Sequence, residues 1–240
     1  MAVEVLEQLY EGKAKKVFKT SDENLYMVEY KDDATAFNGE KRGTIEGKGV
    51  INNKMSAMLF AELEKQGVET HLVEYIDDTH QLVKRVEIVP LEVIARNVIA
   101  GSLSKRVGRP EGEVLPRPIL EFSYKNDELG DPMINRYHAL ALGLATEEEI
   151  DDIIAQAFKI NELLQVIFDK ANLVLVDFKL EFGRTPDGKI ILADEISPDT
   201  CRLWDKDTHE KLDKDRFRRD LGGVEEAYIE VYNRLKNIGL

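Results

Sequence analysis

The chain has 240 residues, of which 43% are hydrophobic and 33% are charged, a composition typical of a globular protein with a substantial core. Its net charge of −13 disfavours general binding to nucleic acid or to an anionic membrane, although a local basic pocket for a phosphorylated metabolite remains compatible with it. No stretch approaches the roughly 20 apolar residues of a membrane span. The segment Met1–Val5 lacks the features of a signal peptide, and the single cysteine excludes an intrachain disulfide, so we expect a cytoplasmic protein.

The first part of the chain, residues 1–89, is predicted to form an antiparallel sheet covered by one helix, an α+β lobe. Periodic apolar residues predict the helix at Gly49–Gln66, with Gly67 in the position of a terminating glycine. The polar segment Lys31–Gly43 is expected to be a long loop. The expected strands are Leu6–Lys19 in two pieces, Leu25–Tyr30, His71–Tyr75 and Gln81–Val89.

A glycine turn separates the first two strands. Gly12 is followed by Lys13, Ala14 and Lys15, and backbone amides and ammonium groups at such a turn can cover a polyphosphate. The turn is not the P-loop that precedes a nucleotide-binding helix, because the spacing of that motif is absent. A solvated basic turn is the competing interpretation.

Pro90 interrupts the apolar run and predicts a hinge, so the second α+β lobe is expected to span residues 90–240. Its first strand, from Leu91, places Glu92 and Arg96 on one face, and an arginine there is suited to binding phosphate or carboxylate. Ser102 follows at the expected start of a short helix. It could cap that helix, or the helix start could bind an anion, and both interpretations stay open.

The rest of the second lobe alternates loops with regular elements. A capping box at Thr146 predicts a long helix ending near Lys170, and an amphipathic helix is predicted after Gly223. We expect Trp204 to fix a polar loop to the core, and the charged segment Lys211–Asp220 to be solvated. Further expected elements are strands at Ile119–Tyr124, Leu173–Phe182 and Ile190–Ile196, and loops at Gly108–Pro118 and Asn126–Asn135.

The expected strand Leu173–Phe182, the first strand of the last hairpin, carries an unusual row of charges. Strict alternation places Asp177, Lys179 and Glu181 on one face. The turn after this strand returns Asp194 to about the level of Glu181, within one residue of register. Two carboxylates and a lysine suit a site for Mg²⁺ and phosphate, because Mg²⁺ takes one or two carboxylates plus phosphate oxygens. A surface row of salt bridges is the alternative.

Several segments together resemble the phosphoribosylaminoimidazole-succinocarboxamide synthase (SAICAR synthetase) family. Two of them match its signatures, and the match then extends in order over almost the whole chain. The signature segments are Val89–Ser102 and Leu175–Gly183, and the others are Tyr10–Lys15, Val50–Lys54, Asp194–Asp199, Arg202–Asp205 and Asp213–Arg218. The resemblance implies a two-lobe fold similar to ATP-grasp enzymes, with antiparallel sheets, flanking helices and ATP between the lobes.

The resemblance also implies an activity and a set of roles. The enzyme would join carboxyaminoimidazole ribonucleotide (CAIR) to L-aspartate, giving SAICAR, ADP and phosphate through an acyl phosphate in purine biosynthesis, with ATP and Mg²⁺ as cofactors. Lys179 and Asp177 would lie at the reacting centre, and Glu181 and Asp194 would bind the metal. The implied nucleotide contacts are Gly12, Lys13, Ala14, Lys15, Lys84 and Ile88, and the implied substrate contacts are Glu92, Arg96, Ser102, Arg202 and Arg218.

Two other functions share part of this pattern. A small-molecule kinase would use the same turn, carboxylates and lysine without a second acceptor. A non-catalytic nucleotide-binding module could keep the turn but would have no use for Glu181 and Asp194 together. A nucleophilic role for Cys201 is disfavoured, because no histidine partner is near it in the sequence. We expect the partners to be small molecules only, without nucleic acid or membrane. We also expect a homo-oligomer, with a dimer favoured, and an L-aspartate site in the loop around Asp131.

Overall fold

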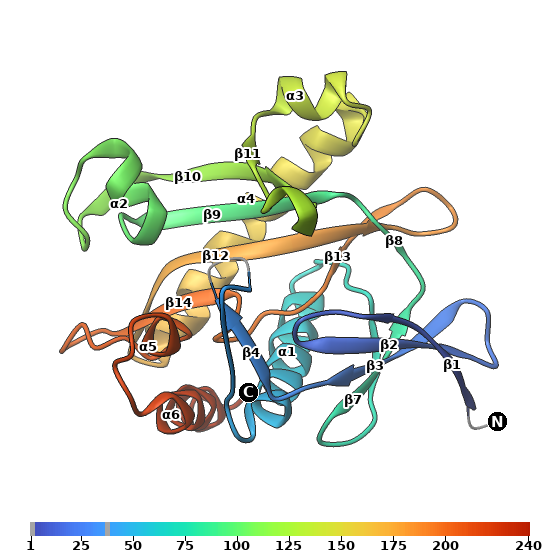
Figure 1. Ribbon diagram of the computed structural model, residues 1–240, viewed down its shortest axis with the longest axis horizontal. Coiled ribbons are helices and arrows are strands. Elements are labelled where there is room, and N and C mark those ends of the chain that lie inside the picture. The colour runs from blue at the N-terminus through green and yellow to red at the C-terminus, as the bar shows by residue number, and fades with distance from the viewer. Residues whose placement is uncertain (1–2, 37–38) are drawn as a thin grey trace.

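The computed structural model describes residues 3–36 and 39–240 and contains two antiparallel sheets with helices packed around them (Figure 1). The first sheet and its neighbouring hairpin contain β1 (Val5–Glu11), β2 (Lys15–Thr20), β3 (Leu25–Tyr30), β4 (Asp33–Ala36), β5 (Lys41–Thr44), β6 (Leu72–Tyr75) and β7 (His80–Lys84). The second sheet contains β8 (Glu87–Ile88), β9 (Leu91–Val98), β10 (Val114–Tyr124), β11 (Met133–Ile134), β12 (Leu173–Arg184), β13 (Ile190–Ala193) and β14 (Cys201–Asp205). The helices are α1 (Lys48–Lys65), α2 (Gly101–Val107), α3 (Arg136–Ala141), α4 (Glu147–Lys170), α5 (Asp215–Arg218) and α6 (Val224–Asn237).

The first sheet has the strand order β1-β2-β3-β7-β6, and each neighbouring pair is antiparallel. Helix α1 packs against β3, β6 and β7, which confirms the predicted sheet with one covering helix. The N-cap of α1 is Gly47, which has no side chain to cap the helix. The carboxylate of Asp32 takes this role, since it accepts the N–H groups of Gly47 at 3.0 Å and Gly49 at 2.8 Å. The stripe predicted for its inner face is buried at Met55, Leu59 and Leu63.

The prediction of one long loop over Lys31–Gly43 is wrong, because most of this segment forms two strands. Asp33–Ala36 pairs with Lys41–Thr44 as a two-stranded hairpin, while Phe37 and Asn38 lie outside the described residues. The two strands are short and largely polar, so they lack the apolar alternation from which strands are predicted. Lys41 Nζ donates to Phe217 O and to Asp220 Oδ1, both at 2.6 Å, and these contacts dock the hairpin next to α5.

The second sheet is organised around β12, which pairs with β9, β13, β14 and β8. Asp177 stands opposite Arg96 on β9 and opposite Arg202 on β14. Glu181 stands opposite Ala193 on β13, so the predicted register with Asp194 is correct to one residue. Strand pairing therefore gathers residues that are far apart in the sequence onto one strand.

Helix α4 covers the other face of this sheet and packs against β12, β9 and β13. The predicted capping box is present, with Thr146 Oγ1 accepting from the N–H of Glu149 at 3.2 Å and the Glu149 carboxylate accepting in return at 2.8 Å. Each fully buried apolar side chain on the helix contributes about 1.5–3 kcal/mol relative to exposure. The buried residues of its predicted inner face are Ile150, Ile153, Ala157, Ile160, Leu164, Ile167 and Phe168.

Several boundaries differ from prediction. The strand expected at Gln81–Val89 is two strands, and the second, β8, pairs with β12 of the second sheet. The strand expected to reach Ile196 ends at Ala193, and Asp194 has φ 57, a left-handed conformation that turns the chain out of the sheet. The loop expected around Trp204 is strand β14, although Trp204 is buried as expected.

The segment Lys211–Asp220, expected to be solvated, is partly buried and contains α5. Asp213 accepts backbone N–H groups from Leu203 and Asp215 at 2.9 and 2.7 Å, which explains how a carboxylate is tolerated inside. Helix α3 was not predicted, and the predicted last helix is present as α6. Within the described ranges, no helix is both long and apolar enough to cross a membrane.

Candidate active site

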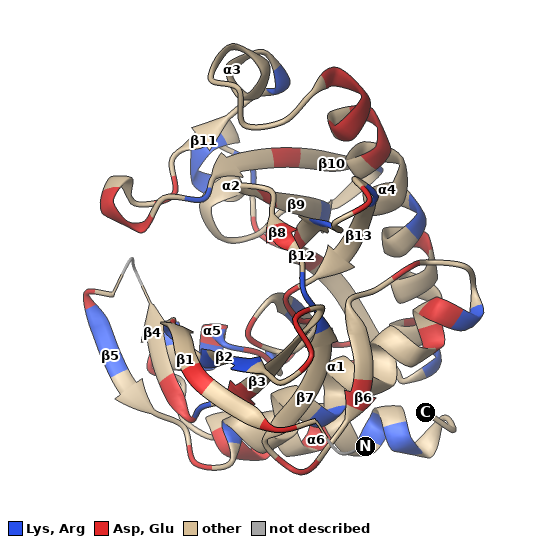
Figure 2. Ribbon diagram, turned by 90° about the vertical axis from the view of Figure 1, so that its right-hand side faces the viewer, with Lys and Arg blue, Asp and Glu red and all other residues tan. Residues whose placement is uncertain are grey.

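A cavity of about 930 Å³ lies between the two sheets and is lined by strands of both. In Figure 2, β1, β2, β3 and the β4–β5 hairpin lie below β9 and β12. Every candidate residue named from the sequence lines this cavity. They are Gly12, Lys13, Ala14, Lys15, Lys84, Ile88, Glu92, Arg96, Ser102, Asp177, Lys179, Glu181, Asp194, Arg202 and Arg218.

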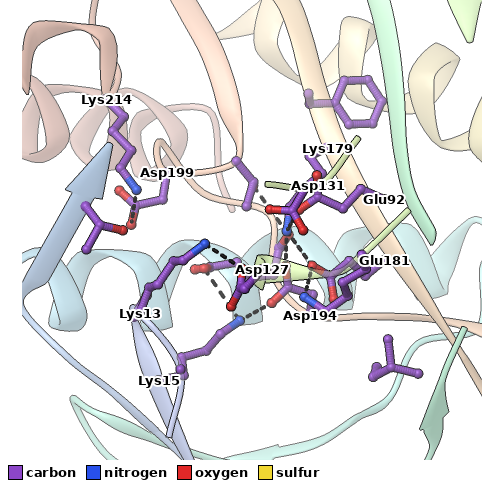
Figure 3. Close-up of a pocket in the computed structure, with 18 of the residues that line it drawn as sticks. Lys13, Lys15, Glu92, Asp127, Asp131, Lys179, Glu181, Asp194, Asp199 and Lys214 are labelled. Carbon is purple, nitrogen blue, oxygen red and sulfur yellow. Dashed lines mark hydrogen bonds and ion pairs between the residues drawn. The ribbon is translucent and has the colours of Figure 1, made fainter. Parts of the chain in front are cut away.

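Lys179 is the centre of a cluster of opposite charges (Figure 3). Its Nζ pairs with Glu181, with Asp194 Oδ2 at 3.2 Å and with Glu92 Oε1 at 3.4 Å. Burial alone would lower the pKa of the Lys179 ammonium, but the surrounding carboxylates, Glu181 foremost, outweigh it and raise that pKa well above its ordinary value. Lys179 is therefore a fixed positive charge and a poor base.

The turn between β1 and β2 reaches the same cluster. The N–H of Gly12 donates to Lys15 O at 2.8 Å, which closes the turn. Lys15 pairs with Asp194, and its Nζ lies 3.5 Å from Glu195 Oε1. Lys13 reaches across the cavity to Asp127 at 2.7 Å. Both lysines line the cavity, but only Lys15 is largely buried, so the interpretation of this turn as merely solvated fails for Lys15, whereas Lys13 is exposed.

Glu181 and Asp194 are the carboxylates that could hold a divalent cation. Burial would raise the pKa of Asp194, but Lys15 and Lys179 outweigh it and lower that pKa, so the carboxylate is ionised. In the described part of the chain, no group of three or more His, Cys, Asp or Glu side chains could hold a metal by itself. Two carboxylates facing a cavity suit Mg²⁺, which completes its shell with water and phosphate oxygens.

The arginines lie in a second cluster around Asp177, which is almost fully buried. Asp177 accepts from Arg96 Nη1 at 2.7 Å and from Arg202 Nη1 at 2.9 Å. Glu121 holds Arg96 at Nε, and Asp215 holds Arg202 at Nε. The carboxylates fix the direction of both guanidinium groups, and each arginine keeps further N–H donors for a ligand.

Ser102 does not cap helix α2. The N-cap is Ala100, which offers no side-chain cap, and the Ser102 hydroxyl instead lies 3.4 Å from Arg96 Nη2 and 3.2 Å from Arg106 Nη1. The capping interpretation is therefore wrong, and the anion-site interpretation stays a prediction. Ser102, Arg96 and Arg202 all line the cavity and offer donors to an anion.

The far end of the cavity is more apolar. Lys84, at the end of β7, donates to Thr70 O at 3.0 Å, and Ile88 lies on β8. Val17, Val28, Val83 and Val86 line the same cavity. An apolar surface of this kind suits a planar base.

Several charged residues in the cavity or buried behind it were not predicted from the sequence. Lys125 lines the cavity and pairs with Glu181 at 3.0 Å. Lys48 is buried, does not line the cavity, and pairs with Asp199 at 2.8 Å. Tyr228 also donates to Asp199, at 2.6 Å. Asp199 lies within a segment that resembles the family. Lys48 and Tyr228 could not be recognised from the sequence as site residues, because Lys48 looks like a solvated lysine and Tyr228 like a tyrosine of the core.

Cys201 is buried beside these groups, and burial raises the pKa of its thiol. A neutral, buried thiol is a poor nucleophile, in agreement with the expectation from the sequence.

The sequence of the chain is similar to those of known proteins. Residues 8–235 match the model of a family described as SAICAR synthetase. A phosphoribosylaminoimidazole-succinocarboxamide synthase of Coprothermobacter proteolyticus is 62% identical over 233 residues, covering 97% of this chain and 99% of that protein. One of Lachnoclostridium phytofermentans is 66% identical over 230 residues, covering 96% and 97%.

Solved structures agree over the same length. Phosphoribosylaminoimidazole-succinocarboxamide synthase from Ehrlichia chaffeensis is 45% identical with a TM-score of 0.94, covering 96% of this chain and 98% of that one. A SAICAR synthetase in complex with ADP is 50% identical with a TM-score of 0.93, at the same coverage. The chain therefore belongs to the SAICAR synthetase family.

Proposed function

We propose that the protein is an ATP-dependent ligase that joins CAIR and L-aspartate to give SAICAR, ADP and phosphate in purine biosynthesis. Family membership and relatives named for this activity support it. The observation that carries the proposal is the meeting, in one cavity, of the β1–β2 turn, the Lys179 cluster and the Arg96–Arg202 pair. These supply a phosphate-covering turn, a site for the transferring charge and an anion clamp.

We propose that ATP lies between two lobes, residues 1–89 and 90–240, in an arrangement similar to ATP-grasp enzymes. The position of the cavity between the sheets and the ADP complex of a related SAICAR synthetase support this. Gly12, Lys13, Ala14 and Lys15 cover the phosphates, since they form the turn that reaches the Lys179 cluster. The adenine lies at the apolar end, near Lys84 and Ile88.

Mg²⁺ is the proposed metal, held by Glu181 and Asp194. The fit rests on the donor set, because both carboxylates line the cavity and both now share the Lys179 ammonium as a counter-charge. When bound, the ion supplies charge neutralisation for the phosphates of ATP. Lys125 and Lys15 orient the two carboxylates from the other side.

For CAIR, we propose that Arg96, Ser102 and Arg202 bind the ribonucleotide phosphate. Their spare N–H and O–H donors face the cavity, and fork-shaped donors match phosphate oxygens. Glu92 and Arg218 are further proposed contacts of the substrate. Burial raises the pKa of Glu92 against the opposing effect of Lys179.

The reaction that this arrangement serves has two steps. A CAIR carboxylate oxygen attacks the γ-phosphorus of ATP, ADP leaves, and an acyl phosphate forms. The amine of L-aspartate, having lost one proton from its ammonium form, then attacks the acyl carbon. Phosphate leaves with the former carboxylate oxygen, and the nitrogen releases a second proton as the amide forms. Lys179 neutralises charge on the transferring group, where positioning and electrostatics supply most of the catalysis. We propose that Asp177 orients the imidazole substrate or assists proton removal, and its two arginine pairs favour orientation.

The test measures ADP release with and without CAIR and L-aspartate. A ligase releases ADP in amounts matched by amide product, and only when both acceptors are present. A small-molecule kinase would release ADP at the same rate without L-aspartate and form no amide, which would overturn the proposal. We further propose a cytoplasmic homo-oligomer, with a dimer favoured, whose partners are these small molecules.

A further inference from the structure

A carboxylate on the loop between α2 and β10, residues 108–113, contacts charged side chains behind Arg202. Glu111 pairs with Lys211 and Arg219, and none of these three residues lines the cavity. The proposed binding of ATP, Mg²⁺ and CAIR uses none of them. Any effect of these charges on the reaction therefore passes through residues that do reach the cavity.

The backbone of this loop is tied to the end of β9. The N–H of Gly112 donates to Ile99 O, and the N–H of Ile99 donates to Glu113 O, both at 2.8 Å. Gly112 has φ 97, which L-residues rarely adopt, so the chain turns sharply directly after Glu111. The position from which Glu111 extends its side chain is therefore fixed by the second sheet.

The Glu111 carboxylate binds both of its cations closely. Arg219 binds it as a fork, with Nη1 3.1 Å from Oε1 and Nη2 2.6 Å from Oε2. Lys211 Nζ donates to Oε1 at 2.9 Å and lies 4.5 Å from the centre of the Trp204 ring. The hydrogen bonds from Arg219 foremost lower the pKa of Glu111 to about 2, against the opposing effect of burial, so the carboxylate is ionised at neutral pH.

Arg219 also lies beside Asp215, the buried carboxylate that holds Arg202 at Nε. Asp215 Oδ2 accepts from Arg202 Nε at 3.0 Å, and its Oδ1 accepts from Arg218 Nη1 at 2.7 Å. Arg219 Nη2 lies 3.5 Å from the same Oδ2 atom that Arg202 uses. Glu111 foremost raises the pKa of Arg219, whereas the Arg202 cation opposes the rise, as a nearby like charge does. Arg219 at hydrogen-bond distance from Oδ2 would therefore weaken the hold of Asp215 on Arg202.

Glu111 thus divides the arginines between two carboxylates. It is the nearer counter-charge of Arg219, at 2.6 Å against 3.5 Å for Asp215. Without Glu111, Arg219 would keep Asp215 as its partner and move toward it, because the attraction between opposite charges rises as they approach. Arg202 would then lose part of its counter-charge and its fixed direction, although Asp177 still pairs with its Nη1.

We propose that Glu111 is a positioning residue for the binding of CAIR: by holding Arg219 away from Asp215, it leaves Asp215 to fix the direction of the Arg202 guanidinium. The proposal rests on the proposed function, in which Arg202 binds the ribonucleotide phosphate. Glu111 itself touches no substrate.

The test compares Glu111→Gln, Arg219→Gln and the variant that carries both changes with the unmodified protein. Glu113→Gln is the matched control, because Glu113 lies on the same loop, pairs with Arg109 at 2.8 Å and does not line the cavity. The dissociation constant of CAIR is measured by titration calorimetry without L-aspartate, and the KM values for CAIR and ATP are measured by ADP release. Urea unfolding shows that each variant is folded, as expected for pairs of partly exposed charges, which contribute little to stability.

We expect Glu111→Gln to raise the dissociation constant and the KM of CAIR about 5- to 20-fold. This is less than the roughly 10- to 100-fold of a whole charge-assisted hydrogen bond, because Asp177 still holds Arg202. The KM for ATP should stay within about twofold. Adding Arg219→Gln to Glu111→Gln should return the binding of CAIR to within about twofold of the unmodified protein, because no second guanidinium then competes for Asp215. Arg219→Gln alone and Glu113→Gln should bind CAIR as the unmodified protein does.

Unchanged binding of CAIR in Glu111→Gln would overturn the proposal. A double variant as weak as Glu111→Gln would overturn it too, because the loss would then come from the loop and not from Arg219. If the unmodified protein binds CAIR but forms no amide, the proposed function fails, while the dissociation constants still decide the role of Glu111. If the unmodified protein does not bind CAIR, both proposals fail.

Discussion

Gly101 at the start of α2 decides where the Arg202 guanidinium can lie. A Cβ at this position would meet Arg202 Nη2 at 2.5 Å and Cζ at 2.8 Å, closer than real Cβ atoms approach such groups. Arg202 cannot retreat freely, because Asp177 and Asp215 hold its two ends. We therefore predict that Gly101→Ala displaces Arg202 from the position in which it is proposed to bind the ribonucleotide phosphate.

The expected magnitude has two parts. Gly101 has φ 54, and an L-residue in this left-handed region costs roughly 1–2 kcal/mol of stability. A charge-assisted hydrogen bond from Arg202 to phosphate contributes about 1.5–3 kcal/mol, which corresponds to roughly 10- to 100-fold in affinity. Gly108, at the other end of α2, provides a matched control, because its φ is 66 and no atom lies within 4 Å of an added Cβ.

The assay measures KM for CAIR and for ATP by ADP release, together with the free energy of unfolding in urea. Both alanine variants should lose stability through backbone strain, and Gly101→Ala should lose at least as much as Gly108→Ala, because it also displaces Arg202. Only Gly101→Ala should raise the KM for CAIR, with the KM for ATP nearly unchanged. An unchanged KM for CAIR in Gly101→Ala, or an equal rise in Gly108→Ala, would refute the reasoning about Arg202.

Three further predictions concern other parts of the molecule. Burial, with Lys15 adding to it, lowers the pKa of His71 from 6.5 to about 4. Between these pH values the unfolded state binds a proton that the folded state does not, so the free energy of unfolding should fall by up to about 3 kcal/mol as the pH drops from 6.5 to 4. Urea unfolding at several pH values should show this slope, and His71→Gln should flatten it. Tyr228→Phe removes the hydrogen bond to Asp199 and should cost about 1.5–3 kcal/mol in urea unfolding, whereas no loss would mean that the bond contributes nothing net. Glu181→Gln should lower kcat about 100-fold or more and raise the Mg²⁺ concentration needed for activity, whereas full activity would favour a non-catalytic nucleotide-binding module.

Much of the fold follows from local pattern in the sequence. The inner faces of α1, α4 and α6 were correctly predicted, because a helix that covers a sheet needs an apolar stripe at helical spacing. The pairing of Glu181 with the strand before Asp194 followed from a short turn that fixes register. The β4–β5 hairpin could not be predicted in this way, since its residues are largely polar. Strand β14 carries the apolar Cys201, Leu203 and Trp204 but spans only five residues, and its strand conformation depends on pairing with β12.

The residues of the candidate site also fall into those that could be predicted from local pattern and those that could not. Alternation along β12 and the resemblance to a family placed Asp177, Lys179 and Glu181 in one row, and the structure brings them into one cavity. The contacts of Asp199 were not predictable, because Lys48, Asp199 and Tyr228 are far apart in the sequence and meet only in the folded chain. Burial of the charged segment containing Asp213 likewise depends on backbone donors supplied by β14.

We propose that this cavity activates the carboxylate of CAIR by phosphorylation before the amine of L-aspartate attacks. The most direct measurement uses CAIR whose carboxylate carries the heavy oxygen isotope, followed by mass analysis of the products. We expect one labelled oxygen in the released phosphate and one in the SAICAR amide. Amide formed without labelled phosphate would contradict an acyl phosphate, because the carboxylate oxygen would then never have been bonded to phosphorus.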